Sequence, residues 1–523
     1  MSLRKAVHRW NPGAAVGWRR ALIAAASGFL LTFGLAPYDL AIVGFLAFPV
    51  LVLMLDGMVR RGEGGRAAFR TGWCFGFGYF VGGLWWLGAA ILVDAATFWW
   101  ALPLAVFGLP AVLAVYYGAA FLLARRAWSQ GAERILILAL AFTLAEWLRA
   151  WLFTGFTWNA LGMLAAPTPL LMQSAALWGL HGLTFLGVVL FCVPALFLTA
   201  TDRRVPVLAL AGLLAAVHLG YGAVRLATVP QAAPPGAVRI SIVQPAIDQS
   251  QKWDPSEARR ILDLLSDMTA QGAVAGERRL VLWPESSFPY LISDESPVVA
   301  AVAQRLGPDD MLLAGAARIE ERGTGEPAYF NAILAIGPDG RIEDRFDKLH
   351  LVPFGEYLPF QAWLERLGIT QLTQMPGGFS AADARRAGQP GGPGEDWPVF
   401  LPLICYEAIF PDEIVRTPDM DLIVNVTNDA WYGNTPGPHQ HLRHAALSAV
   451  AVGLPLVRAA NTGISTVNDA AGRPVAALPL GARGIVEAHL PPATAPTPFA
   501  RFGNWPLAII LGALGAALMF IRR

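Results

Sequence analysis

Three polar side chains lie at or near the ends of short apolar runs, and their chemical types suit nucleophilic catalysis. Glu285 follows the run LVLWP, Cys405 follows the run FLPLI, and Lys348 lies in the segment FDKLH. A cysteine thiolate is a nucleophile, a carboxylate can take the thiol proton, and an ammonium stabilises a thiolate or a developing oxyanion. Each residue also has a structural interpretation: Cys405 as a small core side chain, Glu285 as a helix cap or surface charge, Lys348 as a solvated loop charge. Spacing alone does not decide between them.

The elements that must position these residues are indicated by the surrounding pattern. Apolar, β-branched runs bounded by turn residues are typical of buried strands, and apolar spacing of three and four is typical of helices. The predicted strands are 238–244, 280–283, 311–317, 331–336, 400–405 and 422–425, and the predicted helices are 256–271 and 439–452. Strands that alternate with helices indicate a layered α/β domain, in which catalytic groups gather where strands end. We therefore expect an α/β domain over residues 237–495.

The composition places that domain in a membrane protein. Of 523 residues, 55% are hydrophobic and only 15% are charged, which excludes a disordered chain and argues against a purely soluble one. The 39 Lys and Arg residues balance 38 Asp and Glu residues, so no basic field is available for nucleic acid. Three widely spaced cysteines argue against a disulfide framework and exclude a cysteine-rich metal site.

Apolar segments long enough to cross a bilayer flank the α/β domain. A span needs about 20 apolar residues. We predict seven spans in an N-terminal bundle over residues 1–226, and an eighth after the domain. The predicted spans are 19–37, 39–57, 71–93, 98–124, 134–153, 175–199, 205–226 and 505–521. The expected fold class is a multi-pass α-helical membrane domain of eight spans with an inserted α/β domain.

The distribution of Lys and Arg predicts the orientation of these spans. Basic residues gather at both ends of the chain and in alternate loops, whereas the loops at 94–97 and 154–174 hold none. The terminal basic residues are Arg4, Lys5, Arg9, Arg19, Arg20, Arg522 and Arg523. Because short loops rich in Lys and Arg stay in the cytoplasm, we expect both termini to be cytoplasmic and the α/β domain to lie outside.

A charged pair lies within the fifth predicted span. Glu146 and Arg149 are three residues apart, and so they share one helix face. Charges inside a membrane often mark function. The pair lies just before the outer segment TGFTW, which begins at Thr154. Two interpretations stay open: an interfacial ion pair that anchors this outer loop, or a pair that positions a lipid headgroup or the loop beneath the active site.

The order Glu285, Lys348, Cys405 resembles the Glu-Lys-Cys triad of the nitrilase superfamily. Longer segments resemble one of its families, the apolipoprotein N-acyltransferases, more closely. These segments are QKWDP at 251–255, WPES at 283–286, KLHLVPFGEY at 348–357, CYE at 405–407, TNDAWYG at 427–433 and NTGIS at 461–465. The order of bundle, outer domain and last span fits the same family. The resemblance therefore extends over essentially the whole chain.

This resemblance implies a nitrilase-like αββα sandwich and a ping-pong reaction that completes lipoprotein maturation. Cys405 would attack the ester of a membrane glycerophospholipid, chiefly at its sn-1 chain. The thioester would then pass its acyl group to the α-amine of a diacylglyceryl-modified apolipoprotein. Glu285 would move the protons, and Lys348 would bind the oxyanion with the backbone N–H of Tyr406 as a second donor. No cofactor is implied.

Five supporting residues are also implied by the resemblance: Glu356, Tyr406, Glu407, Trp253 and Asn331. The first would be a second carboxylate that holds Lys348 and Cys405 in place. Tyr406 and Glu407, which follow the nucleophile, would be needed for activity or would only support the structure. The tryptophan would handle the acyl chain or substrate, or would be a core or interfacial aromatic. The asparagine would lie near the pocket.

One further pattern suggests a metal site. His439, His441 and His444 form the sequence H-x-H-x-x-H. Histidine is a common metal ligand, but no acidic partner motif accompanies the pattern, and the chemistry above needs no metal. We therefore expect no metal.

The expected partners are the lipid bilayer, the glycerophospholipid donor and the apolipoprotein acceptor, with no nucleic acid. We expect a monomer in the inner membrane of a bacterium, with its catalytic domain on the periplasmic side. Phe354, Leu358 and Phe360 are expected to form a lid that dips into lipid. The nearest alternative is a membrane-anchored nitrilase-type amidase that passes its acyl group to water. A more distant alternative is a transporter or receptor without catalysis.

Overall fold

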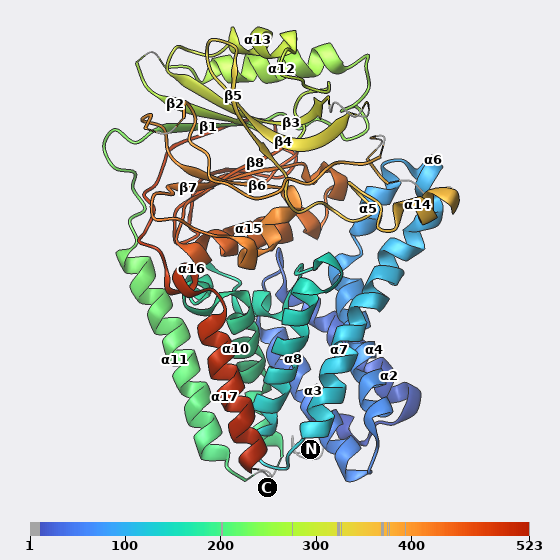
Figure 1. The fold of residues 1–523 in the computed structure, drawn as a ribbon. Coiled ribbons are helices and arrows are strands. Elements are labelled where there is room, and N and C mark those ends of the chain that lie inside the picture. The colour runs from blue at the N-terminus through green and yellow to red at the C-terminus, as the bar shows by residue number, and fades with distance from the viewer. Residues whose placement is uncertain are drawn as a thin grey trace.

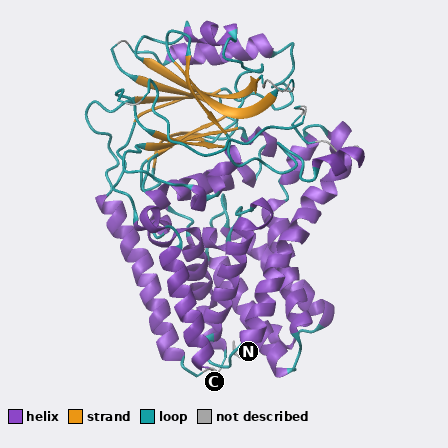
Figure 2. Ribbon diagram, in the orientation of Figure 1, coloured by secondary structure: helices purple, strands orange, loops and turns teal. Residues whose placement is uncertain are grey.

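A computed structural model describes residues 11–199, 202–274, 276–321, 325, 327–367, 371–373, 375, 377–392 and 394–521. The chain forms a bundle of long helices, and a sandwich of two β-sheets is stacked on one end of it (Figure 1). Strands are confined to the sandwich, and helices lie on both of its outer faces (Figure 2). The expected helical region and α/β sandwich are both confirmed.

The bundle is built from apolar helices that approach one another closely. Its long helices are α2 (Gly17–Leu31), α3 (Ile42–Arg60), α4 (Gly65–Leu84), α7 (Leu109–Ala127), α8 (Arg134–Trp151), α10 (Ala175–Leu198), α11 (Arg204–Thr228) and α17 (Trp505–Ile521). The short helices at the end that carries the sandwich are α5 (Leu87–Leu92), α6 (Ala95–Phe98), α9 (Pro169–Met172) and α16 (Pro498–Phe502). A Cβ on Gly28 of α2 would lie 1.9 Å from the carbonyl oxygen of Phe75 in α4. Only glycine permits this close crossing.

Five helices in the described part of the chain are long and apolar enough to cross a membrane. They are Ile42–Arg60, Ala95–Ala127, Arg134–Thr154, Ala175–Leu198 and Arg204–Thr228, and they coincide with five predicted spans. Of the other three predicted spans, 19–37 and 71–93 are largely helical over α2 and α4, and 505–521 contains a shorter apolar helix, Trp505–Phe520. The total of eight spans and their orientation stay predictions. Arg4, Lys5, Arg9, Arg522 and Arg523 lie outside the described residues.

The described strands form two sheets. The first sheet has the order β11-β1-β2-β3-β4-β5, and the second sheet has the order β10-β9-β8-β7-β6. The strands of the first sheet are β1 (Arg239–Gln244), β2 (Arg279–Trp283), β3 (Asp310–Glu320), β4 (Ala328–Ile336), β5 (Ile342–Asp347) and β11 (Gly484–His489). Those of the second sheet are β6 (Phe400–Ile404), β7 (Leu422–Thr427), β8 (Leu456–Ala460), β9 (Ser465–Asn468) and β10 (Pro474–Leu478). Because β6, β7 and β8 run parallel, their carboxyl ends meet at one edge.

The helices of the sandwich lie on opposite sides of it. α12 (Ala258–Gln271) and α13 (Pro297–Ala303) cover the first sheet, and α15 (Pro436–Val452) lies between the second sheet and the bundle (Figure 1). The short α14 (Gln361–Leu364) lies at the side of the sandwich (Figure 1). α15 begins three residues earlier than predicted, because Thr435 caps it by accepting the N–H of Gly437 and Pro436 suits a first turn.

The strands also differ from the prediction. β3 and β4 are longer than expected, and β5 and β8 to β11 were not predicted. The predicted strand 400–405 ends one residue early, because β6 ends at Ile404 and Cys405 begins a turn.

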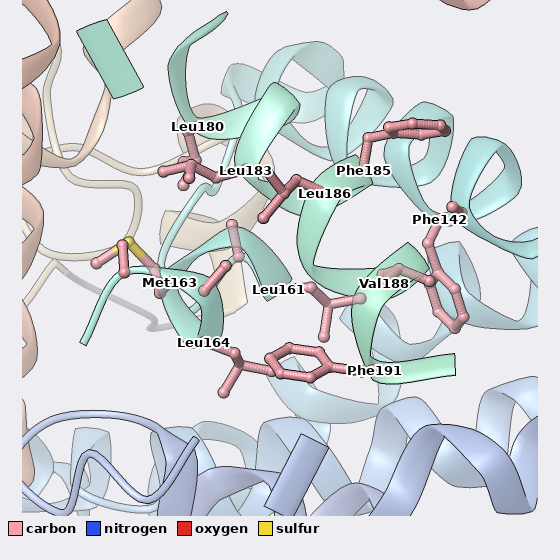
Figure 3. Packing of buried hydrophobic residues seen from close by; sticks show 14 of the residues in the cluster. Phe142, Leu161, Met163, Leu164, Leu180, Leu183, Phe185, Leu186, Val188 and Phe191 are labelled. Atoms are coloured by element: carbon pink, nitrogen blue, oxygen red, sulfur yellow. The ribbon is translucent and has the colours of Figure 1, made fainter. Parts of the chain in front are cut away.

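An apolar core joins the bundle to the sandwich. The outer loop (residues 152–168) folds back onto the bundle, and its short helix η6 (Leu161–Ala165) packs on α10. Figure 3 shows buried leucines of this helix, such as Leu161, beside those of α10, such as Leu183. The same buried cluster continues to Tyr406 and Ile409 of the sandwich. The turn that begins at Cys405 therefore rests on the bundle.

Candidate active site

Cys405 lies at a sharp turn between β6 and the short 3-10 helix η8 (Cys405–Ile409). Its φ angle is +51°, a left-handed conformation that side-chain-bearing residues adopt at a cost and that clusters at functional sites. The side chain is buried. Burial and the Glu285 carboxylate raise the pKa of the Cys405 thiol, although Lys348 opposes them. The resting residue is therefore a thiol, which needs a base before it can attack.

Glu285 follows β2 and Pro284, and its carboxylate is held by two donors. The Nδ2 of Asn331 in β4 donates to Oε1 at 2.7 Å, and the backbone N–H of Asn428 donates to Oε2 at 2.8 Å. The Nζ of Lys348 lies 3.9 Å from Oε1. These two hydrogen bonds fix the orientation of the carboxylate.

Lys348 follows β5 and is completely buried. Its Nζ lies 2.9 Å from the carboxylate of Glu356, which also accepts hydrogen bonds from Asn331 Nδ2 at 2.8 Å and from the Val352 N–H at 2.8 Å. Burial by itself would lower the pKa of Lys348, but Glu356 and Glu285 outweigh it and hold that pKa above its ordinary value. Lys348 is therefore a permanent cation that can donate hydrogen bonds but cannot act as a base.

Asn331 links the two carboxylates of the site. One amide N–H goes to Glu285 and the other to Glu356. Since carboxylates only accept hydrogen bonds, the amide can have only this orientation. The structure thus brings together Glu285, Lys348, Glu356 and Asn331 of the predicted site. Of these residues, Glu285 and Lys348 act electrostatically on Cys405.

Glu407 stabilises the backbone around the site. Its carboxylate accepts the N–H of Ile404 at 2.7 Å and the N–H of Leu349 at 2.9 Å. Ile404 precedes Cys405, and Leu349 follows Lys348 in the chain. Glu407 therefore ties the segment that carries the cation to the turn that carries the thiol, and its contacts favour structural support.

Tyr406 connects the same turn to the bundle. Its hydroxyl donates to the carbonyl of Gly155 in the outer loop at 3.2 Å. In the same interface, the hydroxyl of Thr157 donates to the carbonyl of Ile409. The outer loop is thus hydrogen-bonded to both ends of η8.

The charged pair of α8 holds this loop in place. Glu146 and Arg149 form a buried ion pair. Arg149 Nη1 donates to the carbonyls of Phe156 at 2.5 Å and Trp158 at 3.0 Å, and the hydroxyl of Tyr117 donates to Glu146 at 2.5 Å. Of the two interpretations left open by the sequence, these contacts favour anchoring of the outer loop.

Trp253 does not contact the triad, but Lys252, its neighbour in the sequence, contacts Glu285. Trp253 is 39% exposed, and among the described residues it makes no hydrogen bond or ring contact with the triad. Lys252, which was not predicted, is buried, and its Nζ donates to the backbone carbonyl of Glu285 at 2.7 Å. Burial lowers the pKa of Lys252 to about 8, although Glu285 and Cys405 oppose it. The only sequence signal for Lys252 is its place in the QKWDP segment.

The three histidines of α15 have different surroundings. His441 contacts the Cys405 carbonyl at 2.9 Å and Asp429 at 2.8 Å. His444 accepts a backbone N–H of the outer loop at 3.2 Å, and His439 is half-buried. Potential ligand atoms of Cys405, Asp429 and His441 lie within 4.8 Å of one another. Both ring nitrogens of His441 are already hydrogen-bonded, so a metal ion there would have to break those bonds.

The predicted lid residues do not share one face. Phe354 and Phe360 are 56% and 85% exposed, whereas Leu358 is only 4% exposed. The expectation for Leu358 is therefore wrong. The backbone turns at both phenylalanines, whose φ angles are +62° and +55°, and the leucine between them faces the protein.

The sequence matches known families over both parts of the fold. Residues 27–194 match the family described as "Apolipoprotein N-acyltransferase N-terminal domain", and residues 239–497 match the family "Carbon-nitrogen hydrolase". The apolipoprotein N-acyltransferase of Brucella melitensis biotype 1 is 48% identical over 486 residues, which cover 91% of this chain and 90% of that protein. That of Rhizobium rhizogenes is 46% identical over 493 residues, which cover 91% of each protein. This chain belongs to the apolipoprotein N-acyltransferase family.

Membership in the apolipoprotein N-acyltransferase family confirms the resemblance that the six sequence segments indicated. It also confirms an enzyme and overturns the alternative of a transporter or receptor without catalysis. Among solved structures, Saccharomyces cerevisiae Nit3, described as a member of branch 10 of the nitrilase superfamily, is similar over 50% of this chain and 93% of that chain. Its sequence identity is 16% and its TM-score is 0.37.

Proposed function

We propose that this chain transfers an acyl chain, chiefly the sn-1 chain, from a membrane glycerophospholipid to the α-amino group of a diacylglyceryl-modified apolipoprotein. One observation carries the proposal: in a member of this family, the buried thiol of Cys405 lies at a strained turn with the Glu285 carboxylate and the Lys348 cation around it. Two-step acyl transfer needs a nucleophile, a base and an oxyanion donor, and these three groups can supply them.

In the first half-reaction, Glu285 takes the proton of the Cys405 thiol as Sγ attacks the ester carbonyl carbon. The tetrahedral oxyanion accepts hydrogen bonds from Lys348 and from the backbone N–H of Tyr406. The C–O bond then breaks, and Glu285 returns the proton to the leaving oxygen. The products are a lysophospholipid and a thioester on Cys405.

In the second half-reaction, the acceptor must first lose a proton, because an α-amine has a pKa of about 7.7–8.0. Glu285 takes that proton, and the nitrogen attacks the thioester carbon. The C–S bond breaks as the amide forms, and the thiolate of Cys405 takes the second proton that the nitrogen loses. Glu285 then gives the first proton to water, and the enzyme returns to its starting state.

Glu356 and Asn331 act by holding the reacting groups. Glu356 binds Lys348 in its charged form, so Lys348 remains a donor throughout the cycle. Asn331 fixes the distance between Glu285 and Glu356. We assign Tyr406 and Glu407 to support of the turn, and Trp253, which is partly exposed, to contact with the lipid or acyl chain at the entrance.

The membrane arrangement is part of the proposal. An N-terminal bundle (1–226) with seven spans precedes the catalytic domain (237–495), and an eighth span (505–521) ends the chain. The uneven distribution of Lys and Arg supports cytoplasmic termini and a catalytic domain on the other side of the membrane. Membership in the family supports a bacterial inner membrane, so that this side is the periplasm, and a monomer completes the proposal. In a background without native cysteines, Ala232→Cys should react with an impermeant maleimide on intact spheroplasts, and Gln130→Cys should not. The opposite result would reverse the orientation.

The reaction is tested by intact-protein mass spectrometry of the full chain after incubation with phospholipid. Wild type should gain an acyl-sized adduct, Cys405→Ala should gain none, and the control Cys74→Ala, which changes a cysteine of the bundle, should behave as wild type. A diacylglyceryl peptide with a free amine should release the adduct and become N-acylated. Release only by water would identify the membrane-anchored amidase, and the lack of any adduct on wild type would contradict the mechanism.

A further inference from the structure

The peptide group between Cys405 and Tyr406 carries two polar groups with different tasks. Its carbonyl accepts a hydrogen bond from His441 Nε2 at 2.9 Å. Its N–H is the second oxyanion donor of the proposed mechanism. A trans peptide is planar, and its C=O and N–H point in opposite directions. Whatever holds the carbonyl therefore also aims the N–H.

His441 is itself tightly held. Its Nδ1 lies 2.8 Å from Asp429 Oδ1, and Asp429 also accepts hydrogen bonds from Arg458 Nη2 at 2.6 Å and Thr427 Oγ1 at 2.8 Å. All four side chains are completely buried. The Cys405 carbonyl can only accept, so Nε2 of His441 carries a proton and donates it to that carbonyl. Nδ1 faces both Asp429 and, at 3.2 Å, Arg458 Nη2. The ring has little freedom to turn away from Cys405.

The direction of the carbonyl suits this task. His441 belongs to α15, which lies on the face of the second sheet that is turned toward the bundle (Figure 1). Glu285 and Lys348 follow strands of the first sheet, on the opposite side. A carbonyl held toward α15 turns the N–H of Tyr406 away from α15, toward the side that carries the base and the cation.

The N–H of Tyr406 is also free for a ligand. It belongs to the first turn of η8, where helical N–H groups have no partner within the helix. Within the described ranges, no residue accepts a hydrogen bond from it. Cys405 has a left-handed φ angle, which costs energy for a residue with a side chain. Surrounding contacts such as the one from His441 are therefore needed to hold this conformation.

We propose that His441, held by Asp429, is a positioning residue that fixes the Cys405–Tyr406 peptide plane so that the Tyr406 N–H completes the oxyanion site with Lys348. The inference rests on the proposed acyl transfer. It also excludes His441 as the base of a Cys-His-Asp triad, because its Nε2 proton is already given to the carbonyl and the nitrogen cannot accept the thiol proton.

Two substitutions of His441 separate its two hydrogen bonds. In His441→Gln the amide nitrogen can occupy the place of Nε2 and still donate to Cys405. In His441→Asn the amide nitrogen can occupy the place of Nδ1, which keeps the bond to Asp429 and loses the one to Cys405. The matched control is His439→Gln, on the same helix and half-buried, with no bond to Cys405.

Two rates are measured on each full-length protein. The first is acyl-enzyme formation from phospholipid, which passes through an oxyanion. The second is alkylation of Cys405 by iodoacetamide, which does not, and which is assigned to Cys405 by peptide mapping. His441→Asn should slow acylation by about 10²- to 10³-fold, as expected for loss of one oxyanion donor, and should change alkylation by less than about threefold. His441→Gln should recover at least about tenfold of the lost rate, and His439→Gln should match wild type.

Three results would overturn the inference: acylation by His441→Asn at the wild-type rate, an equal loss of alkylation and acylation, or a His441→Gln variant as slow as His441→Asn. The second result would mean that His441 acts on the thiol or on the fold as a whole. Failure of the proposed function looks different, because wild type would then be alkylated at Cys405 but would form no acyl-enzyme.

Discussion

Lys348 donates to Glu356 across 2.9 Å in a completely buried position. We predict that Glu356→Gln slows acyl-enzyme formation by about 10²-fold, because Lys348 loses its neutralising partner and turns toward Glu285, the proposed base. Intact-protein mass spectrometry at short times gives this rate. Glu365→Gln, an exposed position on the short helix beside α14, should leave it unchanged. An unchanged rate in Glu356→Gln would remove Glu356 from the site.

Glu285 has opposite effects on thiol reactivity and on turnover. Its charge raises the pKa of Cys405, so Glu285→Gln should lower that pKa and increase the thiolate fraction at neutral pH. Alkylation by iodoacetamide should become faster, by up to roughly tenfold for a change of one pKa unit. Acyl-enzyme formation should be lost, since the leaving oxygen has no proton donor. Slower alkylation in this variant would show that the carboxylate does not oppose the thiolate.

Lys252 should give Cys405 a pH-dependent reactivity. The pKa of Lys252 is lowered to about 8, so its ammonium is charged at pH 7 and mostly neutral at pH 9.5. While charged, it favours the thiolate of Cys405. Lys252→Met should therefore be alkylated roughly two- to fivefold more slowly than wild type at pH 7, and the two rates should converge at pH 9.5. A ratio that stays constant between these pH values would contradict a titrating Lys252.

The ion pair in α8 should stabilise the protein through the outer loop. Arg149→Met leaves Glu146 as a buried charge and removes the donor to the carbonyls of Phe156 and Trp158. We expect a loss of about 3–5 kcal/mol in the free energy of unfolding, seen as a lower melting temperature in detergent. The double variant Glu146→Gln, Arg149→Met should recover part of this lost free energy of unfolding. If both variants melt alike, the uncompensated charge is not the cause.

Much of the candidate site could be predicted because its residues end apolar runs. Glu285 and Cys405 follow short runs that the structure shows as β2 and β6. Lys348 and Glu356 lie in one segment whose sequence matched a known family. These signals are local in the sequence, so they can be recognised without knowledge of the fold.

The rest of the site depends on contacts between distant segments. The bond between His441 and the Cys405 carbonyl joins α15 to a turn 36 residues away, and no spacing rule encodes the direction of a peptide plane. Lys252 lies in a polar loop, and its burial depends on the contact between its Nζ and the backbone carbonyl of Glu285, which is distant in the sequence. Leu358 is an apolar loop residue that the sequence predicts in a lid. In the structure it is buried, because the backbone turns at Phe354 and Phe360 direct it toward the protein.

The apolar core that runs from the bundle into the sandwich has a practical consequence for drug discovery. A truncated protein containing only residues 237–495 would expose Ile409, Phe410 and the underside of α15 to water, and Tyr406 would lose the Gly155 carbonyl. Such a fragment would tend to aggregate, and the turn that begins at Cys405 would lose the bundle residues that pack against it. Inhibitor screens on an excised soluble domain would then select compounds for a surface that the cell never presents, so libraries should be screened against the whole chain in lipid.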